Sequence, residues 1–201
     1  MLLDAAALTL IVAFLAGGRL GRLRELDLRA PWIFVAAAAL RVGMVLLGRA
    51  SAPLGAGGLA NIGVLLLVLV GLAANRHLWG MRLAAVGVLL NLLVIGANGG
   101  GMPVDRALAE RAGDQRLLHL LDSPGYVLHQ PITERTRLRP LADVLPLPLL
   151  APRPRWFCPG SVGDVFITAG ACWLLVSGLG AFGLRPGRAG PQAAAVGRAD
   201  L

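Results

Sequence analysis

The sequence predicts an all-α fold: a polytopic integral membrane protein with about five transmembrane helices and an exterior polar segment between the fourth and the fifth. Three observations predict this class. The 201 residues are 56% hydrophobic and only 15% charged, whereas ordinary soluble domains carry about a quarter charged residues. The apolar residues gather in five separated runs. The connections between these runs are short, except for the polar segment.

Each of the five apolar runs predicts a helix, although the first is short for the roughly 17 to 25 residues that a span needs. The fourth run ends at Asn98 and three glycines, which stop a helix. In the first run a small residue at every fourth position, from Ala5 to Gly17, predicts close packing against another helix. The runs cover residues 2–16, 31–48, 58–74, 78–97 and 162–184.

The arginines predict the orientation of the chain. They follow the first run, lie between the third and fourth runs, and follow the fifth, and short basic connections stay in the cytoplasm. We therefore expect a multi-pass protein of the bacterial cytoplasmic (inner) membrane, with its amino terminus outside and its carboxyl terminus inside. The formal charge of +8 does not indicate nucleic-acid binding, because the arginines are scattered over loops without interleaved aromatic residues.

Four parts follow from this topology. Residues 1–97 hold four transmembrane helices, and residues 98–160 form an exterior cap segment with one amphipathic helix, expected at 103–121, and extended stretches. Residues 161–184 form the fifth transmembrane helix. Residues 185–201, rich in Pro, Gly and Ala, are expected to be a disordered cytoplasmic tail.

Polar residues at similar depth near the outer ends of the predicted helices indicate a polar pocket under the cap segment. Asn91 and Asn98 are seven residues apart, nearly two helical turns, so both are expected to project from one face. The predicted ligand-binding or structural pocket consists of Arg41, Asn61, Asn91, Asn98, Asp143, Ser161 and Asp164.

Each pocket residue also has a structural interpretation. An arginine inside a membrane helix is a candidate functional residue, but Arg41 could instead form a salt bridge with Asp164 or Asp143. The asparagines could make hydrogen bonds between helices. Ser161 and Asp164 have the spacing of a capping box at the start of the last helix, which explains both without chemistry.

The sequence shows no metal or cofactor site. The two cysteines, Cys158 and Cys172, are expected at different depths, which argues against a disulfide, and no Cys/His spacing indicates zinc. The three histidines, His77, His119 and His129, are far apart, so solvated loop positions are expected for them. The expected partners are the lipid bilayer and a lipid or peptide ligand, with no nucleic acid. The oligomeric state is open.

Four motifs in a fixed order resemble an uncharacterised family of small bacterial multi-pass membrane proteins, known as domain of unknown function five-three-one-seven. The resemblance covers nearly the whole chain, from the first run to about residue 184. It implies an integral protein of the bacterial envelope without an assigned activity. The motifs are NGGGMPV at 98–104, TRL at 136–138, LADVLP at 141–146 and SVGDVFI at 161–167.

The layout is also similar, more weakly, to the lipoprotein signal peptidases. Those enzymes place two aspartates at the outer membrane face, and Asp105 and Asp164 occupy comparable places here. The Asn that should stand three residues before the first aspartate is Met102, and Ser-Val-Gly precedes the second. A pair formed by Asp143 and Asp164 is an equally open choice.

These observations predict a membrane protein of unknown biochemical role whose outer polar pocket binds a ligand or stabilises the fold. The alternative is an intramembrane aspartyl hydrolase, with Asp164, Asp143 and Asp105 as its catalytic candidates. A transporter has less support, because the inner halves of the predicted helices show no polar path.

Overall fold

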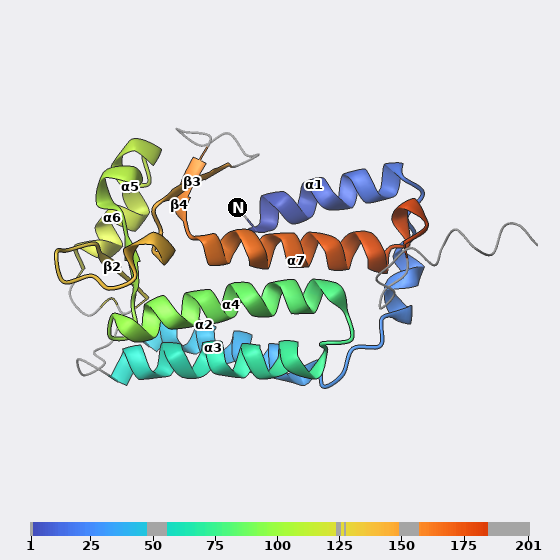
Figure 1. The fold of residues 1–201 in the computed structure, drawn as a ribbon, viewed down its shortest axis with the longest axis horizontal. Coiled ribbons are helices and arrows are strands. Elements are labelled where there is room, and N and C mark those ends of the chain that lie inside the picture. Colours follow the sequence, from blue (N-terminus) through green and yellow to red (C-terminus); the bar gives the residue numbers. More distant parts are fainter. Residues whose placement is uncertain (1, 48–55, 124–125, 127, 149–156, 185–201) are drawn as a thin grey trace, which may run out of the picture.

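The computed structural model describes residues 2–47, 56–123, 126, 128–148 and 157–184. The expected tail at 185–201 lies outside these residues. The fold is mostly helical, with long helices side by side and a smaller group of elements at one end (Figure 1). The bounds of these helices agree with the five predicted runs to within two residues, except that α7 ends at Gly178, six residues before the predicted end. The helices are α1 (Leu2–Leu15), α2 (Trp32–Leu47), α3 (Ala56–Ala74), α4 (Trp79–Ala97) and α7 (Val162–Gly178).

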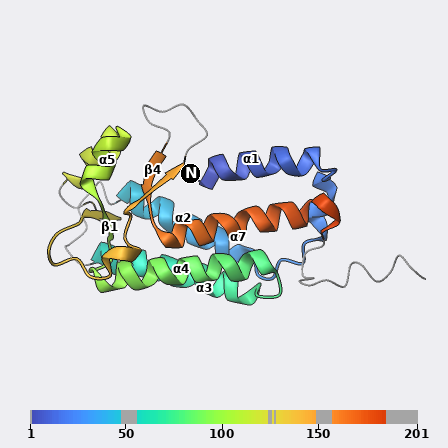
Figure 2. The same cartoon turned by 45° about the horizontal axis from the view of Figure 1, so that its top comes forward.

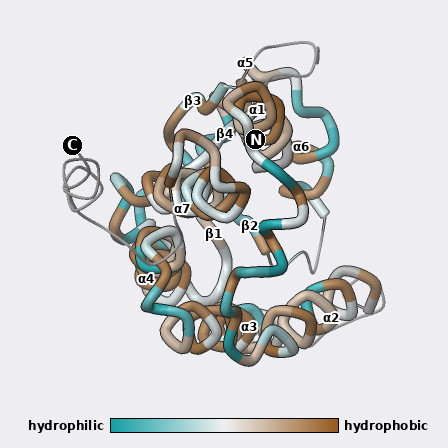
Figure 3. The backbone as a smooth tube through the Cα atoms, turned by 90° about the vertical axis from the view of Figure 1, so that its right-hand side faces the viewer, coloured by the Kyte–Doolittle hydropathy of each residue, from teal (hydrophilic) through white to brown (hydrophobic). Residues whose placement is uncertain are grey.

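The five helices form a bent row in the order α1, α7, α4, α3, α2, each packed against the next (Figures 1 and 3). The last helix of the chain therefore lies inside the row, between α1 and α4. Two helices are long and apolar enough to cross a membrane, over Gly57–Ala74 and Trp79–Ala97. Shorter apolar helices cover Asp4–Leu15, Trp32–Met44 and Val162–Gly178.

Glycines bring α4 and α7 into backbone contact. A Cβ atom added at Gly80 would lie 2.4 Å from the carbonyl oxygen of Gly170, and one at Gly87 would lie 2.4 Å from that of Gly163. The two glycines of each helix are seven residues apart, so each pair lies on one face. Small residues at matching heights let the two backbones approach, as in membrane helix pairs.

The part of the predicted small-residue stripe that lies in α1 packs against α7, whereas Gly17 follows the helix and a Cβ atom there would meet no atom within 4 Å. The Thr9 hydroxyl donates to the Ala5 carbonyl at 2.7 Å, and its oxygen lies 3.0 Å from Cys172 Sγ. Ala13 is fully buried in a cluster with Leu179. Cys172 and Cys158 are free thiols.

At the end away from the cap, Asn75 joins the connection after α1 to the end of α3. Asn75 is fully buried, and its Oδ1 accepts from the Arg29 amide at 2.7 Å. Its Nδ2 donates to the carbonyl oxygens of Arg29 and Gly71, both at 2.8 Å. This end also carries the 3₁₀ helices η1 (Leu20–Glu25) and η4 (Ala181–Gly183).

The segment between α4 and α7 folds as a cap over the other end of the row, as Figure 2 shows. It contains two small sheets: β1 pairs in parallel with β2, and β3 pairs antiparallel with β4. Its elements are β1 (Met102–Val104), α5 (Arg106–Ala112), α6 (Gln115–Leu121), β2 (His129–Pro131), η3 (Arg139–Leu141), β3 (Leu145–Pro148) and β4 (Phe157–Gly160).

The single cap helix expected at 103–121 is wrong in its extent. Pro103 lies in β1, and the helical part is divided into α5 and α6 at Gly113, whose φ of 67° is left-handed. Asp105 and Asp114 each cap one of the two helices, accepting from the amides of Leu108 at 3.2 Å and Leu117 at 3.0 Å. A glycine stop followed at once by a new aspartate cap explains the division.

Candidate functional site

A polar cluster lies where the cap meets the ends of α2, α3, α4 and α7. We call it the cap–bundle site. It combines polar residues of the helices with titratable residues of the cap. Its members are Arg41, Asn61, Asn91, Ser161 and Asp164 from the bundle, and Tyr126, His129, Asp143 and Cys158 from the cap.

Arg41 pairs with an amide. Its Nη1 donates to Asn61 Oδ1 on the neighbouring helix α3, and Asn61 Nδ2 donates to the Gly100 carbonyl at 2.6 Å. Asn61 is only 1% exposed. The salt bridge expected between Arg41 and Asp164 or Asp143 is therefore wrong: within the described ranges, no carboxylate lies within ion-pair distance of Arg41. Asp164 belongs to α7, which is separated from α2 by α4 and α3 in the row.

Asp164 caps its own helix, as the sequence predicted. Ser161 Oγ accepts from the Asp164 amide at 3.0 Å, and Asp164 Oδ2 accepts from the Ser161 amide at 3.0 Å. Asn91 of α4 completes the cluster. Its Nδ2 donates to Asp164 Oδ1 at 3.0 Å, and its Oδ1 accepts from the Ser161 hydroxyl at 2.9 Å. The same residues thus cap α7 and tie it to α4.

Asp143 is held by its backbone, while its side-chain Oδ1 has no hydrogen-bond partner among the described residues. Its amide donates to the Pro103 carbonyl at 2.9 Å, and its carbonyl accepts from the Asp105 amide at 3.1 Å. The residue is 6% exposed, and among the described residues its buried Oδ1 has no hydrogen-bond partner. Burial, and next the charge of Asp164, raise the pKa of Asp143 to about 8. Asp143 is therefore a neutral carboxylic acid at pH 7.

Asp105 has a different place from the other two catalytic candidates. Its carboxylate caps α5, as described above. The following residue, Arg106, binds both oxygens of Asp122 in the cap, at 2.5 and 3.0 Å. The carboxyl group that lies within electrostatic reach of Asp164 is that of Asp143.

Tyr126 and His129 are site residues that the sequence analysis missed. The Tyr126 hydroxyl hydrogen-bonds His129 Nδ1 at 2.8 Å, and the two rings stack with their centroids 5.8 Å apart. Burial, and next the charge of Arg41, lower the pKa of His129 to about 4, so its imidazole is neutral at pH 7. The solvated position expected for His129 is wrong. The one available signal was that Tyr126 is the only tyrosine in the chain.

Asn98 positions the cap and is not part of the cluster around Arg41 and Asp164. It follows the last residue of α4, where its Nδ2 donates to the carbonyls of Val94 at 2.7 Å and Arg137 at 2.9 Å. Its Oδ1 accepts from the Arg137 amide at 2.8 Å. Asn98 is the C-cap residue of α4, directly after Ala97.

No group of three or more His, Cys, Asp or Glu side chains that could hold a metal ion occurs in the part of the chain that the structure describes. The cap–bundle site instead offers one guanidinium, two carboxyl groups, a neutral imidazole, a phenol and a thiol. Such a set can bind a charged ligand, and its two carboxyl groups differ in environment.

These features define a mostly helical protein with two candidate membrane-spanning helices and a polar cluster beneath a cap. Residues 25–176 match the model of a family of unknown function, DUF5317, and the chain belongs to this family. This confirms the family drawn from the four motifs, although α1 precedes the matched range. Neither a curated protein nor a solved structure matches the chain.

Proposed function

We propose that the chain is a five-span protein of the bacterial inner membrane whose cap–bundle site binds a small lipid or peptide ligand at the outer face. The observation that carries the ligand site is Arg41, a half-buried guanidinium within an apolar helix that donates to the side-chain amide of Asn61. A charge at such a position is costly and usually serves a function.

Exposed apolar side chains support the membrane part of the proposal. Leu15 is 85% exposed, Leu59 72% and Val35 69%, on three different helices. Leaving side chains of this size in water forfeits about 1.5 to 3 kcal/mol each, whereas lipid tails solvate them. These residues lie on the long helices and not in the cap, as expected for a surface that faces lipid.

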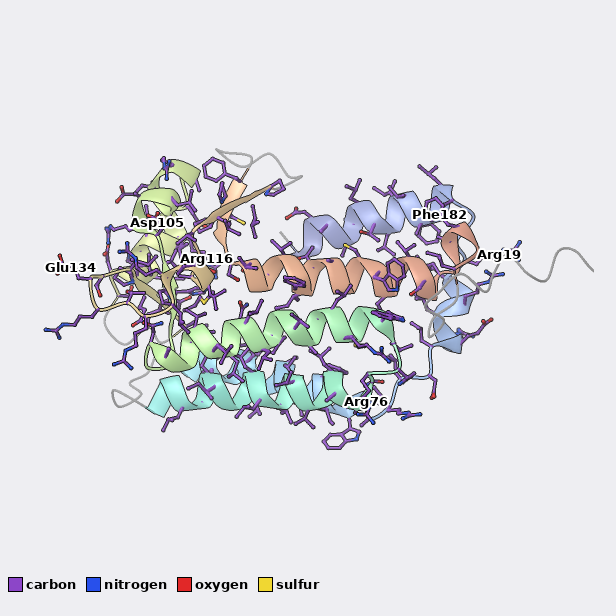
Figure 4. The ribbon with its side chains drawn as sticks, viewed as in Figure 1. Arg19, Arg76, Asp105, Arg116, Glu134 and Phe182 are labelled. Carbon is purple, nitrogen blue, oxygen red and sulfur yellow. The ribbon has the colours of Figure 1, made fainter. Side chains whose placement is uncertain are left out.

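The distribution of charge supports the orientation. Figure 4 shows Arg19 and Arg76 at the end away from the cap, and Asp105, Arg116 and Glu134 in the cap. The arginines at the first of these ends lie in short connections, which favours the cytoplasm. With this end inside, the amino terminus of α1 and the cap lie outside, and the end of α7 lies inside.

Reporter fusions test the five-span topology. Alkaline phosphatase, active only outside the cytoplasm, should be active when fused after Asp122 and inactive after Arg76 or Leu184. Green fluorescent protein fused at the same sites should give the opposite pattern. Phosphatase activity after Arg76 or fluorescence after Asp122 would refute the proposed orientation, and equal cytoplasmic signals at all three sites would refute the spans.

Substitution of Arg41 tests the ligand site. We expect mixed bacterial phospholipids or a lipoprotein-like peptide to raise the thermal midpoint of the full-length protein in detergent. Arg41→Gln should abolish this rise, because the amide keeps a donor for Asn61 but removes the charge. Arg82→Gln is the matched control, since Arg82 is an exposed arginine at the far end of α4. Equal responses of the two variants would contradict the proposal.

A second candidate function is hydrolysis by an aspartate pair, favoured by the raised pKa of Asp143 beside Asp164. A neutral acid next to a second carboxyl group can divide the roles of proton donor and general base. Asp105 is left out because the carboxyl group within electrostatic reach of Asp164 is that of Asp143. On a lipoprotein-like peptide, Asp143→Asn and Asp164→Asn should each abolish turnover while Asp105→Asn keeps it; turnover by Asp143→Asn excludes this candidate.

A further inference from the structure

We propose that the cap–bundle site recognises a zwitterion made of a phosphate and a primary ammonium, the headgroup chemistry of an aminoethyl phospholipid. The phosphate would bind Arg41, and the ammonium would bind between the carboxyl groups of Asp143 and Asp164. This inference rests on the ligand site proposed above and names the class of its ligand.

The first support is that opposite charges are held apart under the same cap. Arg41 lies on α2 and Asp164 on α7, and among the described residues neither forms an ion pair. Their side chains are fixed by amides, Arg41 by Asn61 and Asp164 by Asn91. Unneutralised charges at two separated points favour a ligand that carries both signs.

His129 interacts electrostatically with both charges. Its imidazole lies within electrostatic range of both Arg41 and Asp164, and Tyr126 holds the ring through the 2.8 Å hydrogen bond. Because this imidazole is neutral at pH 7, it adds no charge between the two poles. The phenol and the imidazole can supply hydrogen bonds to the middle of a bound headgroup.

Asp143 supplies the second, independent indication of a missing ligand. More than nine-tenths of this residue is buried, and its Oδ1 has no partner in the described part of the chain. Buried polar atoms in folded proteins nearly always have a partner, so an orphaned carboxyl oxygen calls for an explanation. An ammonium has three N–H donors, enough for the carboxyl groups of both Asp143 and Asp164.

The surroundings of Arg41 favour a lipid as the source of this zwitterion. Helix α2 ends the row, and several of its large apolar side chains face outward: Trp32 is 66% exposed and Leu46 64%. Acyl chains could lie along this surface while the headgroup reaches the guanidinium. A headgroup without an ammonium leaves the Asp164 carboxylate without a counter-charge and the Asp143 oxygen without a donor, so the site favours the zwitterion over anionic lipids.

Binding of defined lipids to the full-length protein in detergent tests the inference, with native mass spectrometry as the readout. Phosphatidylethanolamine should bind about tenfold more tightly than phosphatidylglycerol, which lacks the ammonium, and than phosphatidylcholine, whose quaternary ammonium has no N–H. A tenfold difference in affinity corresponds to about one hydrogen bond to a charged group. Free phosphoethanolamine and inorganic phosphate serve as soluble probes. Binding of free phosphoethanolamine as tight as that of the lipid supports the headgroup chemistry and assigns it to a soluble ligand.

Variants separate the two poles. Arg41→Gln should lower the affinity for both phosphatidylethanolamine and phosphatidylglycerol about tenfold, because both lipids carry the phosphate. Asp143→Asn should weaken phosphatidylethanolamine alone, and Arg82→Gln should change neither. If both lipids bind equally and depend on Arg41, the zwitterion is refuted while the proposed ligand site stands. If binding of none of the probes depends on Arg41, both the zwitterion and the proposed ligand site are refuted.

Discussion

Replacing Gly87 by alanine is expected to cost about 3 kcal/mol of unfolding free energy, the upper end of the usual overpacking penalty. The added Cβ would lie 2.4 Å from the Gly163 carbonyl oxygen and 2.8 Å from the amide nitrogen of Ile167. Both are backbone atoms of α7 and cannot rotate away. The helices must therefore separate, which also strains the hydrogen bonds of Asn91 to Ser161 and Asp164. Thermal unfolding in detergent measures the loss.

Gly96→Ala is the matched control for this experiment, since it lies in the same helix. A Cβ at Gly96 meets no atom within 4 Å, and alanine favours a helix over glycine by about 1 kcal/mol. The control should therefore be neutral or slightly more stable than the wild type. If Gly87→Ala is as stable as Gly96→Ala, the close contact of α4 and α7 does not exist.

Asn75→Ala is expected to cost about 3 kcal/mol, because it leaves several buried backbone groups without a partner. The amide and carbonyl of Arg29 and the carbonyl of Gly71 all lose their bond to the Asn75 side chain. The connection between α1 and α2 would lose its attachment to α3. The thermal midpoint should fall, and limited proteolysis near Arg29 should become faster.

Arg76→Ala provides the comparison, because Arg76 is the next residue and its side chain is exposed. An exposed substitution of this kind changes stability by no more than about 0.5 kcal/mol. If both variants melt at the same temperature, the role assigned to Asn75 is wrong.

The helices could be predicted from sequence because their signals are local. Apolar runs, the glycines after Asn98 and the capping box at Ser161 each act within a few residues, and the structure contains the corresponding elements. The cap was predicted less well. Its strands are three or four residues long and pair across intervals such as 102–104 with 129–131, which no local pattern reveals.

The site was predicted in part for the same reason. Polar residues within apolar helices, such as Asn61 and Asn91, are conspicuous, and both belong to the cluster. The partner of Arg41 depends on which helices are neighbours, and the spacing of residues in the sequence does not predict the order of the helices in the row. Asn75 was missed because its partner Arg29 lies 46 residues away. His129 was missed because the fold of the cap half-buries it and brings it near Arg41, which is distant in sequence.

Asp143, a buried acid whose Oδ1 has no hydrogen-bond partner among the described residues, is central to the proposed site, and stability as a function of pH tests its protonation. The folded-state pKa of about 8 lies above the ordinary 3.8, so between these values unfolding releases a proton and stability falls as pH rises, by about 1.4 kcal/mol per pH unit. His129, with its pKa lowered to about 4 from 6.5, has the opposite effect below pH 6.5.

The measurement is therefore the unfolding free energy of wild type and Asp143→Asn between pH 6.5 and pH 8.5. The wild type should lose about 2 kcal/mol up to pH 8 and then level off, while Asp143→Asn stays constant over the same range. If the unfolding free energy of Asp143→Asn falls with pH as that of the wild type does, or if that of the wild type does not fall, Asp143 is not the buried neutral acid on which the proposed site depends.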